Sequence, residues 1–413
     1  MNNFTNADQN KIRNIPKDWD TAKLGERGFF EVIMGQSPPS STYNKENQGL
    51  PFLQGKMEFG EIFPSPLLYC SKPIKIADKN DVLISVRAPV GDVNISPLKL
   101  CIGRGLASIK CNPQNISYLF LFYFMKYKGK TFENISSGST FKAIRRNELD
   151  NFEILLPSPN EQKKIAEILS TVDQAIEKVG EAIEKTQRLK KGLMQELLAK
   201  GIGHKEYKET PIGTMPKEWV IKKIKDIGNV ITGKTPPTSH ASYWQGKISF
   251  ITPADIKEAK YVYKTERNIT PEGAKQAGHV LPKNAVLVVC IGSTIGKIAL
   301  TYKESVTNQQ INAIVCEDET NPHYIYYALL HRNQVFKSFS GVAAVPIIKK
   351  SLFQEIYLPV PDSAMEQQEI ADILSSIDSR VESLNNRKIK LEKIKKGLME
   401  DLLTGKKRVS LEA

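Results

Sequence analysis

One long segment occurs twice in this chain, and the repeat limits its fold more than any other feature. Residues 161–198 read EQKKIAEILSTVDQAIEKVGEAIEKTQRLKKGLMQELL. Residues 366–403 repeat the segment 205 positions later without an insertion, and 17 of the 38 aligned positions are identical. A repeat of this length sets the architecture and is identified before any local motif. The chain is therefore expected to contain two globular units, each followed by a long helix.

Shorter matches extend the repeat upstream of each long segment. The letters IPKDW at 15–19 return as MPKEW at 215–219, and GQSPP at 35–39 returns as GKTPP at 233–237. We therefore predict four parts: a first globular domain at 1–158, a first helix at 159–204, a second globular domain at 205–362, and a second helix with a C-terminal tail at 363–413.

Apolar residues in both long segments recur four and three residues apart, which predicts a coiled-coil seam. The pattern is weak at Thr186, Lys190, Lys388 and Lys395. A helix of 38 residues is roughly 57 Å long at 1.5 Å per residue. Neither helix can bury its stripe alone, so we expect the two to pair. We predict an antiparallel pair, because a parallel pair would force the second domain, with a radius of gyration of about 15 Å, to span the whole rod.

The globular parts have the pattern of mixed helix and strand. Short β-branched runs at 82–86 and 286–289 are typical of strands, and residues 118–127 and 324–331 have a helical pattern. The predicted fold class is α+β (mixed α/β), with two globular domains joined by two long antiparallel coiled-coil helices in a pseudo-twofold repeat.

The charge balance favours an anionic partner. The chain has 58 Lys and Arg against 45 Asp and Glu, a formal charge of +13, and such an excess favours phosphate groups. Five cysteines without a Cys-x-x-Cys and five histidines without ligand spacing predict neither a disulfide framework nor a metal site. There is no signal peptide and no apolar run of membrane-spanning length, so we expect a cytoplasmic protein without a membrane partner.

The motifs and their order resemble the specificity (S) subunit of type I restriction–modification systems. The resemblance rests on LPxP followed by EQxxIAxILSxxD and KKGLMxxLL, all present twice, on the GQSPP and GKTPP loops, on IGH at 202–204 before PKEW, and on RAPVG at 87–91. It covers essentially the whole chain. It implies that each domain is a target recognition domain that reads one half of a bipartite DNA site, while the helices set the spacer and dock methyltransferase subunits.

The same resemblance implies the partners and the absence of catalysis. Double-stranded DNA, two methyltransferase (M) subunits and, in the full complex, restriction (R) subunits are the expected partners. The chain itself is expected to be non-catalytic and to bind no cofactor. AdoMet, ATP and Mg²⁺ would be bound by the partner subunits.

Two local motifs suggest other functions. Residues 228–235 (GNVITGKT) match the phosphate-binding loop, so a P-loop NTPase using Lys234 is one alternative. Its mechanism needs a helix directly after the lysine, which Pro236 and Pro237 disfavour. Asn321-Pro322-His323-Tyr324 resembles the Asn-Pro-Pro-Tyr motif of adenine methyltransferases. A helix cap with proline at the first helical position explains this sequence without catalysis, and the sequence shows no glycine-rich strand–loop–helix for AdoMet. A coiled-coil DNA-binding adaptor without sequence specificity is the remaining alternative.

The candidate DNA contacts are polar and basic residues of predicted loops, where arginine favours guanine, amides favour adenine, and cations often contact phosphate. In the first domain they are Gln36, Ser37, Ser40, Tyr43, Arg87, Arg104, Lys142, Arg145 and Arg146. In the second they are Lys234, Thr235, Thr238, Tyr243, Ser293, Thr294, Lys297, Asn308, Gln309, Lys349 and Lys350. Residues 341–346 (GVAAVP) lack the polar character of 138–143 (GSTFKA). The two domains are therefore expected to read different half-sites.

Overall fold

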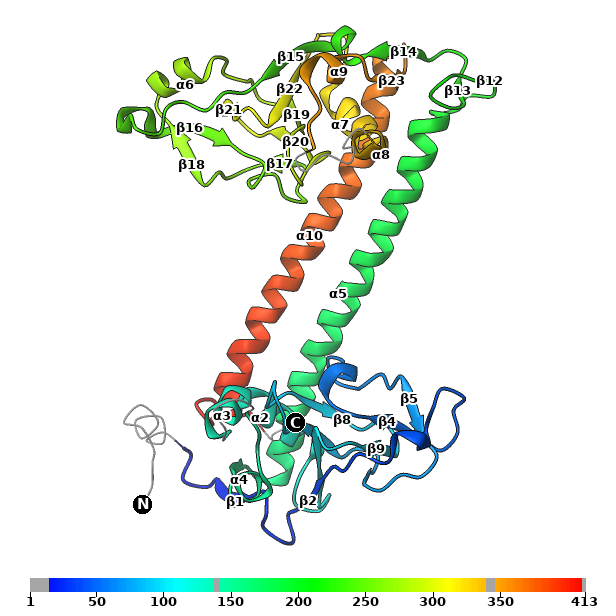
Figure 1. The fold of residues 1–413 in the computed structure, drawn as a ribbon. Coiled ribbons are helices and arrows are strands. Elements are labelled where there is room, and N and C mark those ends of the chain that lie inside the picture. Colours follow the sequence, from blue (N-terminus) through cyan, green and yellow to red (C-terminus); the bar gives the residue numbers. More distant parts are fainter. Residues whose placement is uncertain (1–14, 137–141, 339–345, 411–413) are drawn as a thin grey trace. The chain divides into compact units, whose positions relative to one another are not determined.

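The chain folds into two compact units in a computed structural model that describes residues 15–136, 142–338 and 346–410. Unit 1 comprises the chain up to residue 180 together with residues from 387 onward, and unit 2 comprises residues 181–386. Each unit therefore consists of one globular domain and one end of each long helix (Figure 1).

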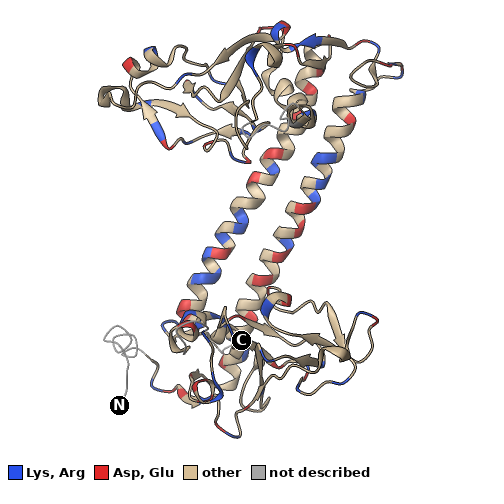
Figure 2. Cartoon of the chain, in the orientation of Figure 1, with Lys and Arg blue, Asp and Glu red and all other residues tan. Residues whose placement is uncertain are grey.

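The two predicted long helices are present as α5 (Pro159–Lys200) and α10 (Ala364–Leu403). Within unit 1, Asp173 contacts Lys395, and Glu161, nearer the start of α5, contacts Arg408, just beyond the end of α10. The two segments therefore run in opposite directions. Unit 2 shows the same antiparallel order, because Lys190 contacts Asp378 while His204 contacts Glu366. Figure 2 shows opposite charges interspersed along both helices. The antiparallel prediction is confirmed within each unit.

The ends of the helices pack differently from the prediction. Ile165 and Leu169 near the start of α5, and Leu402 at the end of α10, belong to the hydrophobic core of the unit 1 domain. Leu198 and Leu374 likewise belong to the core of the unit 2 domain. A helix that packs on a domain shows nearly the same apolar period as a coiled-coil seam. Part of the predicted seam is therefore domain core.

The described part of unit 1 contains a four-stranded sheet, a five-stranded sheet, one two-stranded pair and three short α-helices. Its antiparallel four-stranded sheet has the order β2 (Phe30–Met34), β10 (Leu106–Cys111), β7 (Val82–Ser85), β8 (Val93–Ile95). The five-stranded sheet has the order β3 (Tyr43–Asn44), β5 (Leu68–Cys70), β4 (Leu50–Leu53), β9 (Leu100–Ile102), β6 (Ile76–Ala77). The helices are α2 (Tyr118–Tyr127), α3 (Gly129–Ile135) and α4 (Arg146–Asp150). β1 (Asp20–Lys23) pairs with β11 (Glu153–Leu156) directly before α5.

Unit 2 has a related arrangement with different numbers of strands in its sheets. Its five-stranded sheet has the order β15 (Gly228–Thr232), β22 (Ile311–Cys316), β19 (Val286–Val289), β20 (Ile298–Thr301), β17 (Tyr261–Val262). A second sheet has the order β18 (Arg267–Ile269), β16 (Trp244–Ile251), β21 (Ser305–Thr307), and β12 (Tyr207–Lys208) pairs with β13 (Met215–Pro216). The helices are α6 (Pro271–Ala277), α7 (Pro322–His331), α8 (Asn333–Ser338) and α9 (Lys350–Gln354). β14 (Val220–Lys223) pairs with β23 (Tyr357–Val360) directly before α10. The predicted mixed, two-domain fold is confirmed.

A buried glutamate ties the start of α5 to the rest of unit 1. The indole nitrogen of Trp19 donates a hydrogen bond of 3.1 Å to Glu161. The guanidinium of Arg408, just beyond α10, donates to both oxygens of Glu161 at 2.7 and 2.8 Å and to both oxygens of Asp18. These contacts close the C-terminal segment onto the first domain, and the guanidinium holds the pKa of the Asp18 carboxyl below its usual value.

Unit 2 builds the same junction with different chemistry. Trp219 donates a 3.1 Å hydrogen bond to Glu366 at the start of α10. His204, just beyond α5, takes the position that Arg408 holds in unit 1, with its ring nitrogens 2.9 Å from Glu366 and 3.0 Å from Glu218. The IGH segment at 202–204 therefore places His204 where it joins the second domain to the start of α10.

The structure assigns structural roles to both motifs that suggested catalysis. The Asn321 side chain accepts hydrogen bonds from the backbone N–H groups of His323 and Tyr324 and caps α7, with Pro322 as the first helical residue. Residues 228–232 form strand β15, and the first helical turn after Lys234 is the 3-10 turn Ala241–Tyr243 (η4). The P-loop alternative is therefore wrong, because the described segment directly after Lys234 does not begin a helix.

Candidate nucleic-acid interface

A loop at the end of β2 gathers three of the predicted contact residues of unit 1. Gly35 lies so close to the turn before β10 that a Cβ atom there would be 2.2 Å from the Gly103 carbonyl oxygen. The Ser37 hydroxyl accepts a 3.2 Å hydrogen bond from the backbone N–H of Arg104. The side chains of Gln36 and Arg104 are exposed. We name Gln36, Ser37 and Arg104 the unit 1 loop cluster.

The same loop in unit 2 gathers a different set of side chains. A Cβ atom at Gly233 would lie 2.3 Å from the Thr307 carbonyl oxygen, so this loop also packs tightly on the turn before the next strand. The Thr235 hydroxyl donates a 2.7 Å hydrogen bond to the Gln309 side-chain oxygen. Lys234 is exposed beside this pair. We name Lys234, Thr235 and Gln309 the unit 2 loop cluster.

Asn308 has a different role from the predicted one. Its side chain is buried, with 8% exposure. Its amide donates to the Gln310 side chain at 2.8 Å and its oxygen accepts from the Gln310 backbone N–H at 3.1 Å. The sequence pattern could not distinguish a turn-forming amide from an exposed one. We therefore assign Asn308 to shaping the turn that presents Gln309.

The residues that follow each Pro-Pro pair hold the loop in place or face solvent. The Tyr43 hydroxyl donates a 2.8 Å hydrogen bond to the Pro38 carbonyl, and its ring lies 4.6 Å from that of Phe52. The Tyr243 ring contacts that of His240 in a tilted geometry, with ring centroids 5.1 Å apart. Ser40 and Thr238 are exposed. Both tyrosine side chains thus contact neighbouring residues of their own loop or sheet.

The loop after β7 lies beside the segment before α4. Arg87 pairs with Ala143 in a β-bridge, and the Ala88 N–H donates a 3.2 Å hydrogen bond to the Lys142 carbonyl, so the exposed side chains of Arg87 and Lys142 share one region. Residues 138–141 of the segment lie outside the described residues.

The corresponding bridge in unit 2 joins two apolar residues, Ile291 and Ile347. The nearby turn carries Ser293, Thr294 and Lys297, and the Lys297 ammonium donates a 3.1 Å hydrogen bond to the Ile256 carbonyl. Residues 341–345, whose apolar character suggested a difference between the domains, lie outside the described residues. The bridge residues differ in the same way, because unit 1 has Arg87 where unit 2 has the apolar Ile291.

Each domain places a basic pair at the start of a short helix. Arg145 and Lys349 occupy the position immediately before α4 and α9, and Arg146 and Lys350 are the first helical residues. All four side chains are exposed, and Arg146 donates a 3.0 Å hydrogen bond to Asp150. The two pairs therefore occupy equivalent positions, as the repeat predicts.

A basic groove of about 930 Å³ runs along β2 of unit 1 and contains two cations that the sequence patterns did not indicate. Arg27, Lys75 and Arg146 line the groove together with Gln36 of the loop cluster, while Glu31 is its one acidic lining residue. The backbone of Lys75 is held beside β9, because its carbonyl accepts a 2.9 Å hydrogen bond from the Ile102 N–H. A groove with excess positive charge suits a phosphate backbone.

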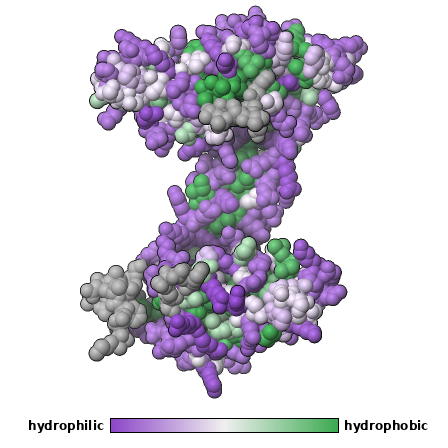
Figure 3. All heavy atoms as spheres, in the orientation of Figure 1, coloured by the Kyte–Doolittle hydropathy of each residue, from purple (hydrophilic) through white to green (hydrophobic). Residues whose placement is uncertain are grey.

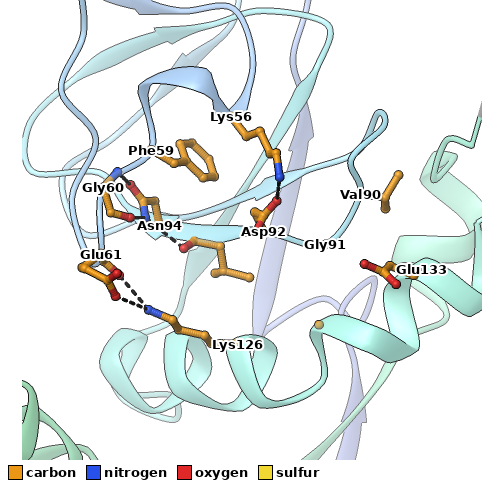
Figure 4. Close-up of a pocket in the computed structure, with 12 residues that line it drawn as sticks. Lys56, Phe59, Gly60, Glu61, Val90, Gly91, Asp92, Asn94, Lys126 and Glu133 are labelled. Carbon is orange, nitrogen blue, oxygen red and sulfur yellow. Dashed lines mark hydrogen bonds and ion pairs between the residues drawn. The ribbon is translucent and has the colours of Figure 1, made fainter. Parts of the chain in front are cut away.

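A second cavity of unit 1, about 380 Å³, has a different character (Figure 4). Lys56 forms an ion pair with Asp92, and Lys126 donates a 2.8 Å hydrogen bond to the Glu61 carbonyl and contacts its carboxylate. Burial lowers the pKa of Lys126. Both lysines thus have carboxylate partners, so this cavity is less suited to phosphate than the groove along β2.

Other site chemistries find no support among the described residues. No group of three or more His, Cys, Asp or Glu side chains within the described ranges could hold a metal ion. None of the described helices combines the length and apolarity needed to cross a membrane. Burial raises the pKa of Cys111 to about 12, which disfavours the reactive thiolate form of this half-buried residue.

Comparisons with known proteins agree with this arrangement. The chain is 24% identical over 407 residues to the type I restriction enzyme MjaVIII specificity subunit of Methanocaldococcus jannaschii, covering 96% of this chain and 94% of that protein. The putative MjaX specificity subunit of the same organism is 50% identical over 190 residues, which span only 46% of this chain and 45% of that protein. The crystal structure of the type I S subunit from M. genitalium shares the fold, with a TM-score of 0.64 at 16% identity over 97% of this chain and 98% of that one.

The family model supplies the assignment. The model described as the type I restriction modification DNA specificity domain matches this chain twice, at residues 16–185 and 216–393. Each match begins at a PKxW motif and runs into one of the long helices, α5 or α10. Because the two matches cover well over half of the sequence, the chain belongs to the type I restriction modification DNA specificity domain family.

Proposed function

We propose that this protein is the DNA-recognition subunit of a type I restriction–modification complex and that each domain reads one half of a bipartite site. The observation that carries the proposal is that one scaffold presents different side chains at the same place in its two copies. Unit 1 offers Gln36 and Arg104, whereas unit 2 offers Lys234 and Gln309. Equivalent loops with different hydrogen-bonding groups suit two different half-sites.

The groove along β2 extends this proposal to the DNA backbone. Arg27, Lys75 and Arg146 would contact phosphates, while Gln36 at the end of the same groove would face a base edge. Phosphate contacts fix the position of a protein on the duplex, and contacts in the grooves of DNA provide specificity. We assign all chemistry to partner subunits, which would bind AdoMet, ATP and Mg²⁺, and we place the complex in the cytoplasm, where the DNA is.

Two equivalent surfaces on the long helices favour two methyltransferase partners. Leu189 of α5 and Ile394 of α10 are 56% and 51% exposed and lie 205 positions apart. Three residues beyond them, Gly192 and Gly397 face open space, with no atom near an added Cβ. A glycine inside a helix costs about 0.5–1 kcal/mol relative to alanine. Figure 3 shows apolar side chains at the surface of the long helices. We propose that a partner backbone approaches each glycine.

Methylome sequencing of a host that carries this subunit and its methyltransferase partner tests the main proposal. We expect one methylated motif made of two half-sites with a gap of fixed length. Exchanging residues 20–155 for the first domain of another family member should change one half-site and keep the other. A continuous motif, or a change in both half-sites, would contradict the proposal.

Alanine at Gly192 and Gly397 tests the docking surface. Gly192→Ala with Gly397→Ala should stabilise the helices while reducing the amount of methyltransferase that copurifies with the chain. Gly180→Ala is the matched control, because Gly180 also faces open space inside α5 but its repeat partner is Asn385. If the wild type, the double variant and Gly180→Ala all copurified with equal amounts of methyltransferase, the proposed docking surface would be contradicted.

A further inference from the structure

A cluster of three polar side chains joins the domain of unit 1 to both long helices. The Tyr123 hydroxyl of α2 donates a 2.8 Å hydrogen bond to one oxygen of Asp173 in α5. The other oxygen of Asp173 forms an ion pair of 2.5 Å with Lys395 of α10. One carboxylate therefore connects the domain, the helix that follows it and the opposite helix.

Unit 2 contains the same three residue types with the roles of the two helices exchanged, and Ser375 and Lys260 also contact its tyrosine hydroxyl at 3.3 and 3.4 Å. The Tyr327 hydroxyl of α7 donates a 2.6 Å hydrogen bond to Asp378, which is now on α10. Asp378 forms an ion pair with Lys190, which is now on α5. Asp378 and Lys395 lie 205 positions after Asp173 and Lys190, so the long repeat encodes both clusters.

The unit 1 cluster is largely buried and the unit 2 cluster is half-buried, so simple stabilisation is a poor explanation for them. The side chains of Asp173 and Lys395 are 10% and 15% exposed. Tyr123 and Tyr327 are buried, and burial beside a carboxylate raises the pKa of both hydroxyls, so they remain donors. A buried ion pair often adds no more stability than an apolar pair of the same size.

The two lysines also interrupt the apolar seam of each helix. Lys190 and Lys395 occupy positions of the 3-4 pattern where an apolar residue is expected. A polar residue at a seam position typically specifies how helices pair, at some cost in stability. Here the polar position is also connected to the recognition domain through the tyrosine.

We propose that the two Tyr–Asp–Lys clusters are positioning elements that fix the orientation of each recognition domain on its helix pair, and so determine which gap between half-sites is accepted. This inference rests on the proposed function. A domain that tilts on its helices moves its half-site along the duplex, where one base pair corresponds to about 3.4 Å. The clusters thus confer spacing specificity without contacting DNA.

Tyr123→Phe and Tyr327→Phe test the inference, because each removes one hydroxyl and leaves the ring in the core. Tyr326→Phe is the matched control, since Tyr326 is a buried neighbour on α7 whose hydroxyl makes no hydrogen bond within the described part of the chain. Each variant is assembled with its methyltransferase subunits and titrated against duplexes whose gap is the preferred length or one base pair longer or shorter.

The wild type should prefer its own gap, and Tyr123→Phe or Tyr327→Phe should reduce that preference by about tenfold, the lower end of the range for one hydrogen bond to a charged group. Affinity for the preferred gap and the half-site sequences should change little. Lys395→Met should act like Tyr123→Phe, whereas Lys395→Arg should retain the preference because it keeps the ion pair.

An unchanged gap preference in both phenylalanine variants, with a normal bipartite motif, overturns this inference alone. An equal loss of affinity at every gap length also overturns it, because that pattern indicates a folding role only. A wild-type complex that methylates no gapped motif overturns the proposed function, and this inference with it.

Discussion

Alanine at Gly35 should impair recognition of one half-site and leave the other intact. The added Cβ would lie 2.2 Å from the Gly103 carbonyl oxygen and 2.7 Å from that of Leu106. Both neighbours are backbone atoms, so the loop must move by roughly 1 Å, and overpacking of this kind costs about 1–3 kcal/mol. The displacement would break the 3.2 Å hydrogen bond between Ser37 and Arg104.

The assay is competition binding with duplexes altered in one half-site at a time. Gly35→Ala should reduce discrimination at the half-site of unit 1 by about tenfold, the lower range for loss of one base contact. Gly233→Ala should do the same at the other half-site, because its Cβ would lie 2.3 Å from a backbone carbonyl. Urea denaturation should show a lower free energy of unfolding for both variants.

Gly55→Ala is the control within unit 1, because an added Cβ there meets no atom within 4 Å. It should retain wild-type stability and discrimination. If Gly35→Ala lost stability while discrimination at both half-sites stayed at the wild-type level, the loop cluster would not be the surface that reads DNA.

Three further predictions follow from charge, length and titration. Arg27→Gln and Lys75→Gln should weaken binding to all DNA sequences about equally, and each should reduce the slope of log K against log salt by about 1. Fluorescence anisotropy over a salt series measures both effects, and a changed base preference would show that these residues read bases. Inserting four residues into both α5 and α10, after Ala182 and Arg387, should lengthen the accepted gap by about two base pairs at 1.5 Å per residue; methylome sequencing measures the gap, and an unchanged gap would refute the role of the helices as a ruler. An insertion in α5 alone should lower the stability of the chain in thermal unfolding, because both ends of each helix are buried in domain cores. Burial lowers the pKa of Lys260 to about 8 from 10.5, so the charge of this lysine disfavours the folded state fully below pH 8 and progressively less as the pH approaches 10.5. In urea titrations between pH 7.5 and 9.5, the free energy of unfolding of the wild type should therefore rise relative to that of Lys260→Met. A constant difference between the two proteins would contradict the lowered pKa of Lys260.

The sequence was sufficient for the parts of the fold that depend on local pattern. Periodicity and the repeat predicted α5 and α10, and the cap explanation of Asn321 is confirmed because capping is a local interaction. The apolar stripe could not show where seam becomes domain core, since both kinds of packing bury residues at nearly the same period. Leu198 and Leu402 are examples.

Tertiary contacts account for most of what the sequence could not provide. Lys190 and Lys395 interrupt the apolar pattern in the sequence, but their carboxylate partners lie on the opposite helix and depend on how the two helices pair. Arg27 and Lys75 come from separate loops and share no motif, so the groove that they line was missed. The roles of the other predicted contact residues in DNA binding remain predictions, because exposure alone does not distinguish a DNA contact from a solvated side chain.

The composition of the two units has a consequence for biosynthesis. Unit 2 is one continuous stretch, residues 181–386, whereas unit 1 needs residues from 387 onward, including Leu402 in its core and Arg408 on Glu161. Domains synthesised on the ribosome usually fold in the order in which they emerge. Here the domain that is translated first must await the end of α10 before its core and its glutamate junction are complete. The second recognition domain can therefore reach its native state before the first, and nascent chains stalled between residues 386 and 408 would carry an unfinished first domain.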